Sequence, residues 1–244
     1  MKLLTPLISF ARRNFTNRKS WKKFSLSNGT LKVPSKFNKI LDDKARAEYQ
    51  STVDWIEQLS PAMMKRKIPR ANVQQAFVFH TVNHFYRPGS RILCVGSHED
   101  TAWDALKKIG ICIEDLDPVK NYDLNTFYHL KTTKKAYYDI VFSTSVIEHV
   151  EHDDQFLAQI EDLLAPNGIG ILTCDFKEDY KNGDYIFPGN YRFYTKENLT
   201  AKFKQILTQC AILDAPEWDC PHPDFLFEGQ QYTFATLVFK KKYS

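Results

Sequence analysis

The sequence has no apolar run that approaches the roughly 20 residues a membrane-spanning helix needs. Its N-terminal apolar residues are too few and too interrupted for a secretory signal, and no small-residue cleavage site follows them. Cysteine is also scarce. The five cysteines form an odd set without paired spacing. That pattern predicts free thiols in a reducing compartment rather than disulfides. The protein is therefore expected to be cytoplasmic.

Acidic residues are absent from residues 1–41, which hold ten lysines and arginines. The whole chain has 33 basic and 29 acidic residues, so a basic arm precedes a body of net negative charge. One helical face of the arm carries apolar residues: Leu4, Leu7, Ile8, Ala11 and Phe15. Such a helix either packs on the protein's own body or lies peripherally on the inner membrane surface through residues 1–24. Nucleic acid is the least favoured partner, because the arm lacks repeated basic blocks with interleaved aromatic residues.

Hydrophobic periodicity divides the rest of the chain into two parts. Apolar residues recur at three- and four-residue steps from Asp42 to about Leu59 and again after Pro69, which predicts a helical cap over residues 42–88. Over residues 89–244, short apolar runs alternate with helical segments, which predicts a mostly parallel sheet with helices on both faces. The predicted strands are Ile92–Val95, Ile111–Leu116, Asp139–Phe142, Ile169–Cys174, Ala211–Leu213 and Thr233–Phe239.

Polar residues follow several of these strands at their carboxyl ends, where open α/β sheets bind ligands. They are Gly96–Asp100, Asp117, Ser143–His149 and Asp175. Asp117 follows Gly96 by 21 residues, which is the right spacing for a carboxylate that accepts both ribose hydroxyls. The alternative is an ordinary turn at Asp117-Pro118. The sequence therefore predicts a nucleotide-cofactor site that opens at Gly96.

Glycine is scarce as well, with nine in the chain, and the turn after the first predicted strand has one of them. A dinucleotide needs a G-x-G-x-x-G turn and a helix N-terminus free for the pyrophosphate. Here Gly96 is followed by Ser97, His98, Glu99 and Asp100, so two carboxylates stand where the pyrophosphate would lie. This charge argues against NAD. It is compatible with S-adenosylmethionine, which carries a sulfonium and an ammonium against one carboxylate.

Three segments resemble the class I S-adenosylmethionine-dependent methyltransferases. Residues 138–150 read YDIVFSTSVIEHV, residues 163–168 read LLAPNG, and residues 191–195 read YRFYT. The last is similar to a segment of the small-molecule and glycan-modifying members, and the resemblance extends from about Arg91 to Phe239. It implies a Rossmann-like fold, S-adenosylmethionine as cofactor, and O-methylation of a saccharide or related polar metabolite in glycan biosynthesis.

The resemblance also implies which residues bind the cofactor: Gly96, Ser97, His98, Asp117, Asp123, Ser143 and Ser145. Gly96 and Ser97 would approach the methionyl part, and Asp117 the ribose. Only 22 residues separate Asp117 from Asp139, where the family normally has a helix and a strand. The sheet is therefore expected to be abbreviated between the family's second and fourth strands, with Asp123 or Asn125 serving the adenine.

His149 is the predicted general base, because it follows a strand at the binding edge and imidazole titrates near neutrality. Alternatively, the Glu-His-Val segment fixes the loop. Asp175 is the second catalytic candidate. His149, His152 and the acids around them do not complete a ligand set, so no metal is predicted. The aromatic-rich segment Lys177–Asn190 is predicted either to cover a substrate or to pack on the domain.

Two further interpretations stay open at the level of sequence. The family's first motif usually has three glycines, and here His98 and Asp100 stand at two of those positions. A methyltransferase-like scaffold that binds a partner without catalysis is therefore one alternative. RNA methylation through the basic arm is the other. The sequence indicates neither the atom that is methylated nor the oligomeric state.

Overall fold

The computed structural model describes residues 34–243, so the predicted membrane-contact segment 1–24 and most of the basic arm lie outside the described residues. Seven strands form the sheet: β1 (Ile92–Val95), β2 (Glu114–Leu116), β3 (Tyr138–Thr144), β4 (Leu164–Phe176), β5 (Cys210–Ile212), β6 (Phe225–Phe227) and β7 (Gln230–Lys241). Their order is β2-β1-β3-β4-β7-β5, with β6 paired to β7. The first four run parallel, and β7 is antiparallel to β4. The predicted mostly parallel, Rossmann-like sheet is confirmed.

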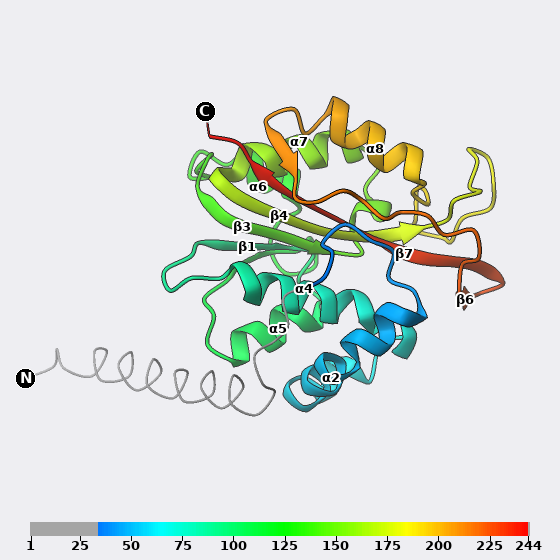
Figure 1. Cartoon of the computed structure of the whole chain (residues 1–244). Coiled ribbons are helices and arrows are strands. Elements are labelled where there is room, and N and C mark those ends of the chain that lie inside the picture. Colours follow the sequence, from blue (N-terminus) through cyan, green and yellow to red (C-terminus); the bar gives the residue numbers. More distant parts are fainter. Residues whose placement is uncertain (1–33, 244) are drawn as a thin grey trace, which may run out of the picture.

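Helices cover both faces of this sheet (Figure 1). One face carries α2 (Asp43–Leu59), α4 (Asn72–Phe85) and α5 (Thr101–Lys108), with the short α3 (Pro61–Met64) and the 3-10 helix η1 (Pro69–Ala71) between α2 and α4 in the chain. The other face carries α6 (Leu124–His129), α7 (Asp153–Leu163) and α8 (Lys196–Gln205). A second 3-10 helix, η2 (Ile147–His149), follows β3.

The strands are buried on both faces, and their side chains alternate between two cores. Ile92 and Cys94 of β1 belong to the core beneath α4 and α5. Leu93 and Val95 belong to the core beneath α6 and α7. Successive strand residues point to opposite faces, so an unbroken apolar run fits this position and an alternating one would not.

Side-chain caps fix where the helices begin. Asp100 accepts the backbone N–H of Trp103 at 2.7 Å at the start of α5, and Thr195 accepts that of Asn198 at 3.1 Å at the start of α8. Such bonds satisfy N–H groups that the first turn of a helix leaves unpaired. The cap at Asp100 also ends the turn that begins at Gly96, so it sets the length of the candidate cofactor turn.

The predicted helical cap shares its core with the sheet. Phe77, Val78 and Phe79 of α4 are fully buried, and α4 packs against α2, α5, β3 and β4. The predicted boundary at residues 88 and 89 therefore crosses one continuous hydrophobic core.

The end of the predicted basic arm also belongs to the body of the protein. Asn38 is fully buried, and its side-chain amide donates to Asp214 at 2.9 Å and to the carbonyl of Val238 at 3.0 Å. Ile40 forms a bridge with Ala235 of β7. Residues 37–41 are therefore held against the antiparallel part of the sheet.

The sheet is abbreviated after β2, as expected. Residues 117–137 contain the short α6 and no strand, which leaves β2 at the edge of the sheet. β2 is also shorter than predicted, because only Glu114–Leu116 pairs with β1. β4 also begins earlier than the predicted strand Ile169–Cys174, and it includes residues 166–168, where the register shifts and Asn167 has a φ of 63°.

None of the helices in residues 34–243 is long and apolar enough to cross a membrane. All five cysteines are free thiols, and four of them are buried.

Candidate cofactor and acceptor site

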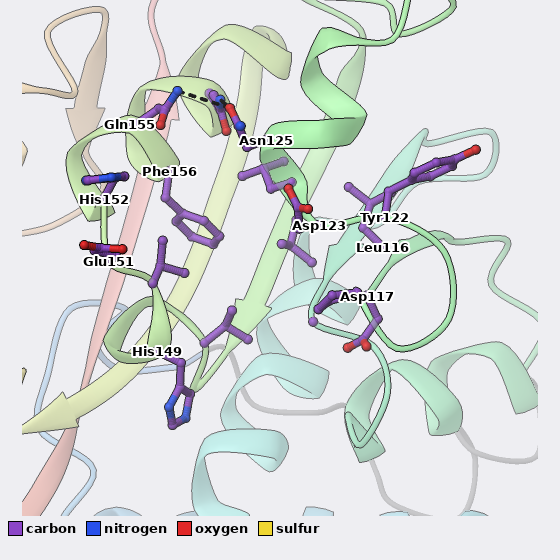
Figure 2. A pocket seen from close by; sticks show the side chains of 17 residues that line it. Leu116, Asp117, Tyr122, Asp123, Asn125, His149, Glu151, His152, Gln155 and Phe156 are labelled. Atoms are coloured by element: carbon purple, nitrogen blue, oxygen red, sulfur yellow. Dashed lines mark hydrogen bonds between the residues drawn. The ribbon is translucent and has the colours of Figure 1, made fainter. Parts of the chain in front are cut away.

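A first cavity of about 390 Å³ opens at the carboxyl ends of β1, β2 and β3. Its walls are mainly apolar and include Val95, Leu116, Val146 and Phe156. Figure 2 shows Phe156 and Leu116 on opposite sides of this space, with Asp123 nearby. A cavity of this size, apolar with a few polar groups, is typical of small-molecule sites.

The Gly96 turn and Asp117 form one end of the first cavity. Gly96 has a φ of +87°, and a Cβ there would lie 2.3 Å from Val146 Cγ2. The backbone N–H of His98 donates to Asp117 Oδ2 at 2.9 Å, and that of Val119 donates to Oδ1 at 2.8 Å. Asp117 is buried, so these bonds fix its carboxylate at the cavity. Each oxygen keeps a second lone pair for a ligand hydroxyl.

The residues of the first cavity fit a nucleoside. Apolar walls suit a purine, and a fixed carboxylate suits the ribose hydroxyls. Asn125 Oδ1 accepts from Gln155 at 3.1 Å and Gln159 at 2.8 Å, which leaves its amide hydrogens to donate (Figure 2). Asp123 lines the same cavity, and its carboxylate caps α6. The predicted residues Gly96, Asp117 and Asp123 are thus brought together.

Two of the predicted cofactor residues instead face inwards. Ser97 is fully buried, and its hydroxyl donates to Asp115 at 2.8 Å and accepts from Lys120 at 3.0 Å. Ser143 is also buried, and its hydroxyl donates to the carbonyl of Val95 at 3.0 Å. Both side chains connect neighbouring chain segments, and neither lines the two cavities described. The alternation of strand and turn residues does not reveal which serines turn inwards.

A second cavity of about 420 Å³ lies beside the first, past the ends of β3 and β4. Ser145, His149 and Asp175 line it together with five aromatic residues: Phe187, Phe225, Phe227, Tyr232 and Phe234. His149 lines both cavities, and its Nδ1 lies 3.1 Å from the carbonyl oxygen of Gly189. The Lys177–Asn190 segment contributes to this cavity through Phe187, which supports its predicted covering position.

Asp175 lines the second cavity and lies next to a second buried carboxyl, Glu148. Glu148 is fully buried and accepts from the hydroxyl of Ser145 at 2.7 Å, and Asp175 accepts from the amide of Asn190 at 3.1 Å. Burial raises the pKa of both carboxyls, and the charge of Glu148 raises the pKa of Asp175 further. Two buried neighbouring carboxyls cannot both ionise readily, because the charge of one opposes ionisation of the other.

Sequence reasoning did not include Glu148 among the site residues. Its signals were its place in the polar segment Ser143–His149 at the binding edge and in the Glu-His-Val segment, next to the candidate base His149. The conformation of the loop after β3 also indicates a functional position for Glu148, because Ser145 has a left-handed φ of 55°. Its backbone N–H donates to the carbonyl and hydroxyl of Thr173, which holds the loop in this conformation. Among residues 34–243, no group of three or more histidines, cysteines or acids is placed to hold a metal.

Comparison with protein-family models matches residues 102–172 to a methyltransferase domain. Two curated relatives are ubiquinone biosynthesis O-methyltransferases, from Rickettsia canadensis (strain McKiel) and Rickettsia typhi (strain ATCC VR-144 / Wilmington). The first is 32% identical over 125 residues, which cover 48% of this chain and 49% of the relative. The second is 34% identical over 125 residues, which cover 46% and 50%. The chain thus spans about half the length of the curated relatives it matches.

Solved structures share the fold at low sequence identity. One is a 1,6-didemethyltoxoflavin-N1-methyltransferase of Burkholderia thailandensis with bound S-adenosylhomocysteine, with a TM-score of 0.51 and 13% identity, covering 81% of this chain and 90% of that one. Another is the [4+2]-cyclase SpnF, with a TM-score of 0.50 and 13% identity, covering 82% and 97%. The second case shows that this fold also serves other reactions, so the fold alone does not define the chemistry.

The strand order, with β7 antiparallel beside the parallel strands, together with the matched segment 102–172, defines a Rossmann-like methyltransferase domain. The matched residues 102–172 include the segments at 138–150 and 163–168, whose resemblance to the class I S-adenosylmethionine-dependent methyltransferases this match supports.

Proposed function

We propose that the protein transfers a methyl group from S-adenosylmethionine to a hydroxyl of a small ring-shaped acceptor. The observation that carries this proposal is the pair of cavities that meet at His149. The first would hold the adenosine half of the cofactor, and the second would hold the acceptor. In this arrangement the cofactor supplies an activated methyl group, and the protein supplies alignment, exclusion of water and removal of one proton.

His149 is the group we assign to proton removal. Its imidazole stands between the two cavities, and the contact with the carbonyl oxygen of Gly189 orients Nδ1 as a donor. Nε2 is then the nitrogen that accepts a proton from the acceptor hydroxyl. Asp175 is the second candidate, since it lines the second cavity and lies beside the buried carboxyl of Glu148.

Two kinds of acceptor suit the second cavity. A saccharide, as predicted from the sequence, would stack its ring on the aromatic residues that line it. A hydroxyl-bearing aromatic compound would do the same, and the names of the two rickettsial relatives favour O-methylation in quinone biosynthesis. We place the protein in a reducing compartment, in keeping with its free cysteines. Incubation with S-adenosylmethionine and each class of acceptor, followed by mass spectrometry, distinguishes the two.

Calorimetric titration with S-adenosylhomocysteine tests the first cavity. Wild-type protein should bind, and Asp117→Ala should weaken binding by about tenfold or more, because a charge-assisted hydrogen bond contributes ~1.5–3 kcal/mol. Asp115→Asn is the matched control, because Asp115 lies on β2, two residues before Asp117, but bonds Ser97 and does not line the cavity. If wild-type protein bound no cofactor at millimolar concentration, the protein would be interpreted as a non-catalytic scaffold and not as an enzyme.

Replacement of His149 by glutamine should lower the rate of methyl transfer by about 100-fold, in the range of general-base catalysis. Cofactor affinity should stay within about threefold, because glutamine preserves a donor toward Gly189. His152→Gln is the control, because His152 lines the first cavity but not the second. A His149→Gln rate close to wild type, combined with a slow Asp175→Asn variant, would transfer the role to Asp175.

A further inference from the structure

We propose that the second cavity selects ring-bearing acceptors without negative charge, neutral or cationic, and rejects carboxylated or phosphorylated ones. This inference rests on the proposed methyl transfer and narrows its substrate class. It concerns the cavity between Ser145, His149, Asp175 and the β6–β7 hairpin, which we call the acceptor cavity.

The acceptor cavity has a continuous aromatic wall. The ring of Phe187 lies 5.5 Å from that of Phe227 and 5.6 Å from that of Tyr232, centroid to centroid. The ring of Phe225 lies 5.0 Å from Tyr232 and 4.9 Å from Phe234. These residues come from the covering segment and from two strands, so tertiary structure assembles the wall. Aromatic faces stack on rings and attract cations.

The ionisable groups around the acceptor cavity are mainly carboxyls. Asp175 and Glu228 line it, Glu148 lies behind Ser145, and no lysine or arginine is among its lining residues in the described chain. Burial raises the pKa of the Tyr232 hydroxyl, and the charges of Asp175, Glu148 and Glu228 raise it further. All three carboxyls therefore act on the same region of the cavity, and Tyr232 stays a neutral phenol.

Nearby cations are engaged elsewhere. Lys67 and Arg70, which adjoin the lining residues Ile68 and Ala71 in the chain, pair with Glu99 at 3.8 Å and with Asp43 at 2.7 Å. Among the described residues that line the cavity, His149 is the one group able to carry a positive charge, and it must be neutral to act as the base. An acceptor carboxylate or phosphate would then meet the charge of the Glu148–Asp175 pair and of Glu228 without a lysine or arginine to pair with. In a partly desolvated site, one such repulsion at several ångströms weakens binding by about tenfold or more. Nucleotide-linked sugars are thereby disfavoured, and neutral sugars and phenols are not.

Three probes that share one ring test this inference: benzyl alcohol, benzylamine and benzoate, titrated by ligand-observed NMR into the full chain saturated with S-adenosylhomocysteine. Benzoate should bind at least about tenfold more weakly than benzyl alcohol, and benzylamine at least as tightly as benzyl alcohol. Glu228→Gln should narrow the ratio of the benzoate and benzylamine dissociation constants by about threefold, because it removes one exposed charge at the hairpin turn. Glu197→Gln on α8, a surface carboxylate outside the cavity, should leave it unchanged.

Phe227→Leu should weaken the binding of all three probes by a similar factor. That result would show that the probes bind at the aromatic wall. Benzoate binding as tight as benzylamine binding would overturn the proposal, and so would the absence of binding by any probe at millimolar concentration. The preceding titration with S-adenosylhomocysteine separates these failures from failure of the proposed function. A chain that binds the cofactor but prefers benzoate has methyltransferase character and a different acceptor class.

Discussion

Replacement of Gly96 by alanine should lower the free energy of unfolding by about 2–4 kcal/mol and abolish measurable binding of S-adenosylhomocysteine. Gly96 has a φ of +87°, a conformation that alanine adopts at a cost of about 1 kcal/mol. The larger effect is steric, because the new Cβ would lie 2.3 Å from Val146 Cγ2. Gly96 and Val146 both line the first cavity, so their separation would distort its wall. Chemical denaturation and calorimetry measure the two effects.

Two control variants separate conformation from contact. Gly89 has a φ of +92°, and no atom lies within 4 Å of the position that a Cβ would take there. Gly89→Ala should therefore cost only the conformational part, about 1 kcal/mol. Val146→Ala added to Gly96→Ala should restore part of the stability, since it removes the clashing methyl groups. If Gly96→Ala were no more destabilising than Gly89→Ala, the close contact with Val146 would have no energetic importance.

Replacement of Asp153 by alanine should destabilise the protein by about 3 kcal/mol, the lower end of the range for breaking a buried ion pair. The carboxylate accepts from the hydroxyl of Tyr194 at 2.7 Å, from Arg192 at 2.6 Å and from Lys202 at 2.9 Å. Its side chain is 8% exposed, so removal leaves these donors without their acceptor. The chain from Asn190 to Tyr194 should loosen, and with it the acceptor cavity. Urea denaturation measures the loss.

The effect of Asp153 should depend on pH. Burial opposes ionisation of this carboxyl, but hydrogen bonds from Tyr194, Lys202 and Arg192 outweigh it and hold its pKa below the ordinary value. The stabilisation is therefore complete above the pKa of the unfolded state, about 3.9, and is lost as the pH falls through the lower folded value. The difference in unfolding free energy between wild type and Asp153→Asn should therefore become smaller as the pH is lowered.

Asp154→Asn is the matched control for Asp153. Asp154 is the next residue on α7, its side chain is 59% exposed, and it pairs with Lys202. Such surface pairs contribute about 0–1 kcal/mol, so this variant should remain close to wild type. Equal losses of unfolding free energy in the two variants would mean that burial of Asp153 does not make its ion pairs more stabilising than those of Asp154.

Local sequence patterns were sufficient for most of the fold. The apolar runs at Ile92–Val95 and 139–142 predicted strands because a strand covered on both faces needs no alternation. Asp100 and Thr195 cap α5 and α8, because short polar side chains satisfy the free N–H groups of a first turn. The shortened segment after Asp117 followed from the resemblance, because only 22 residues separate Asp117 from Asp139 where the family normally has a helix and a strand.

Contacts between distant residues were beyond reach of such patterns. Asn38 bonds Val238 across 200 residues, and nothing in the local sequence of either indicates the other. The pairing of Glu148 with Asp175 likewise depends on the register of β3 against β4. The family resemblance assigned Ser97 and Ser143 to the cofactor, because both lie at the carboxyl ends of strands. The direction of a short side chain, however, is set by neighbours that only the folded chain supplies.

The abbreviated segment after β2 has a consequence for association between molecules. It leaves β2 at the edge of the sheet, where unpaired backbone groups can recruit another strand. Only three residues are offered there, and two of them are Glu114 and Asp115. A second copy that docked along this edge would gain few backbone hydrogen bonds and would bring carboxylates against carboxylates. The shortness and the negative charge of β2 thus disfavour edge-to-edge aggregation along this strand.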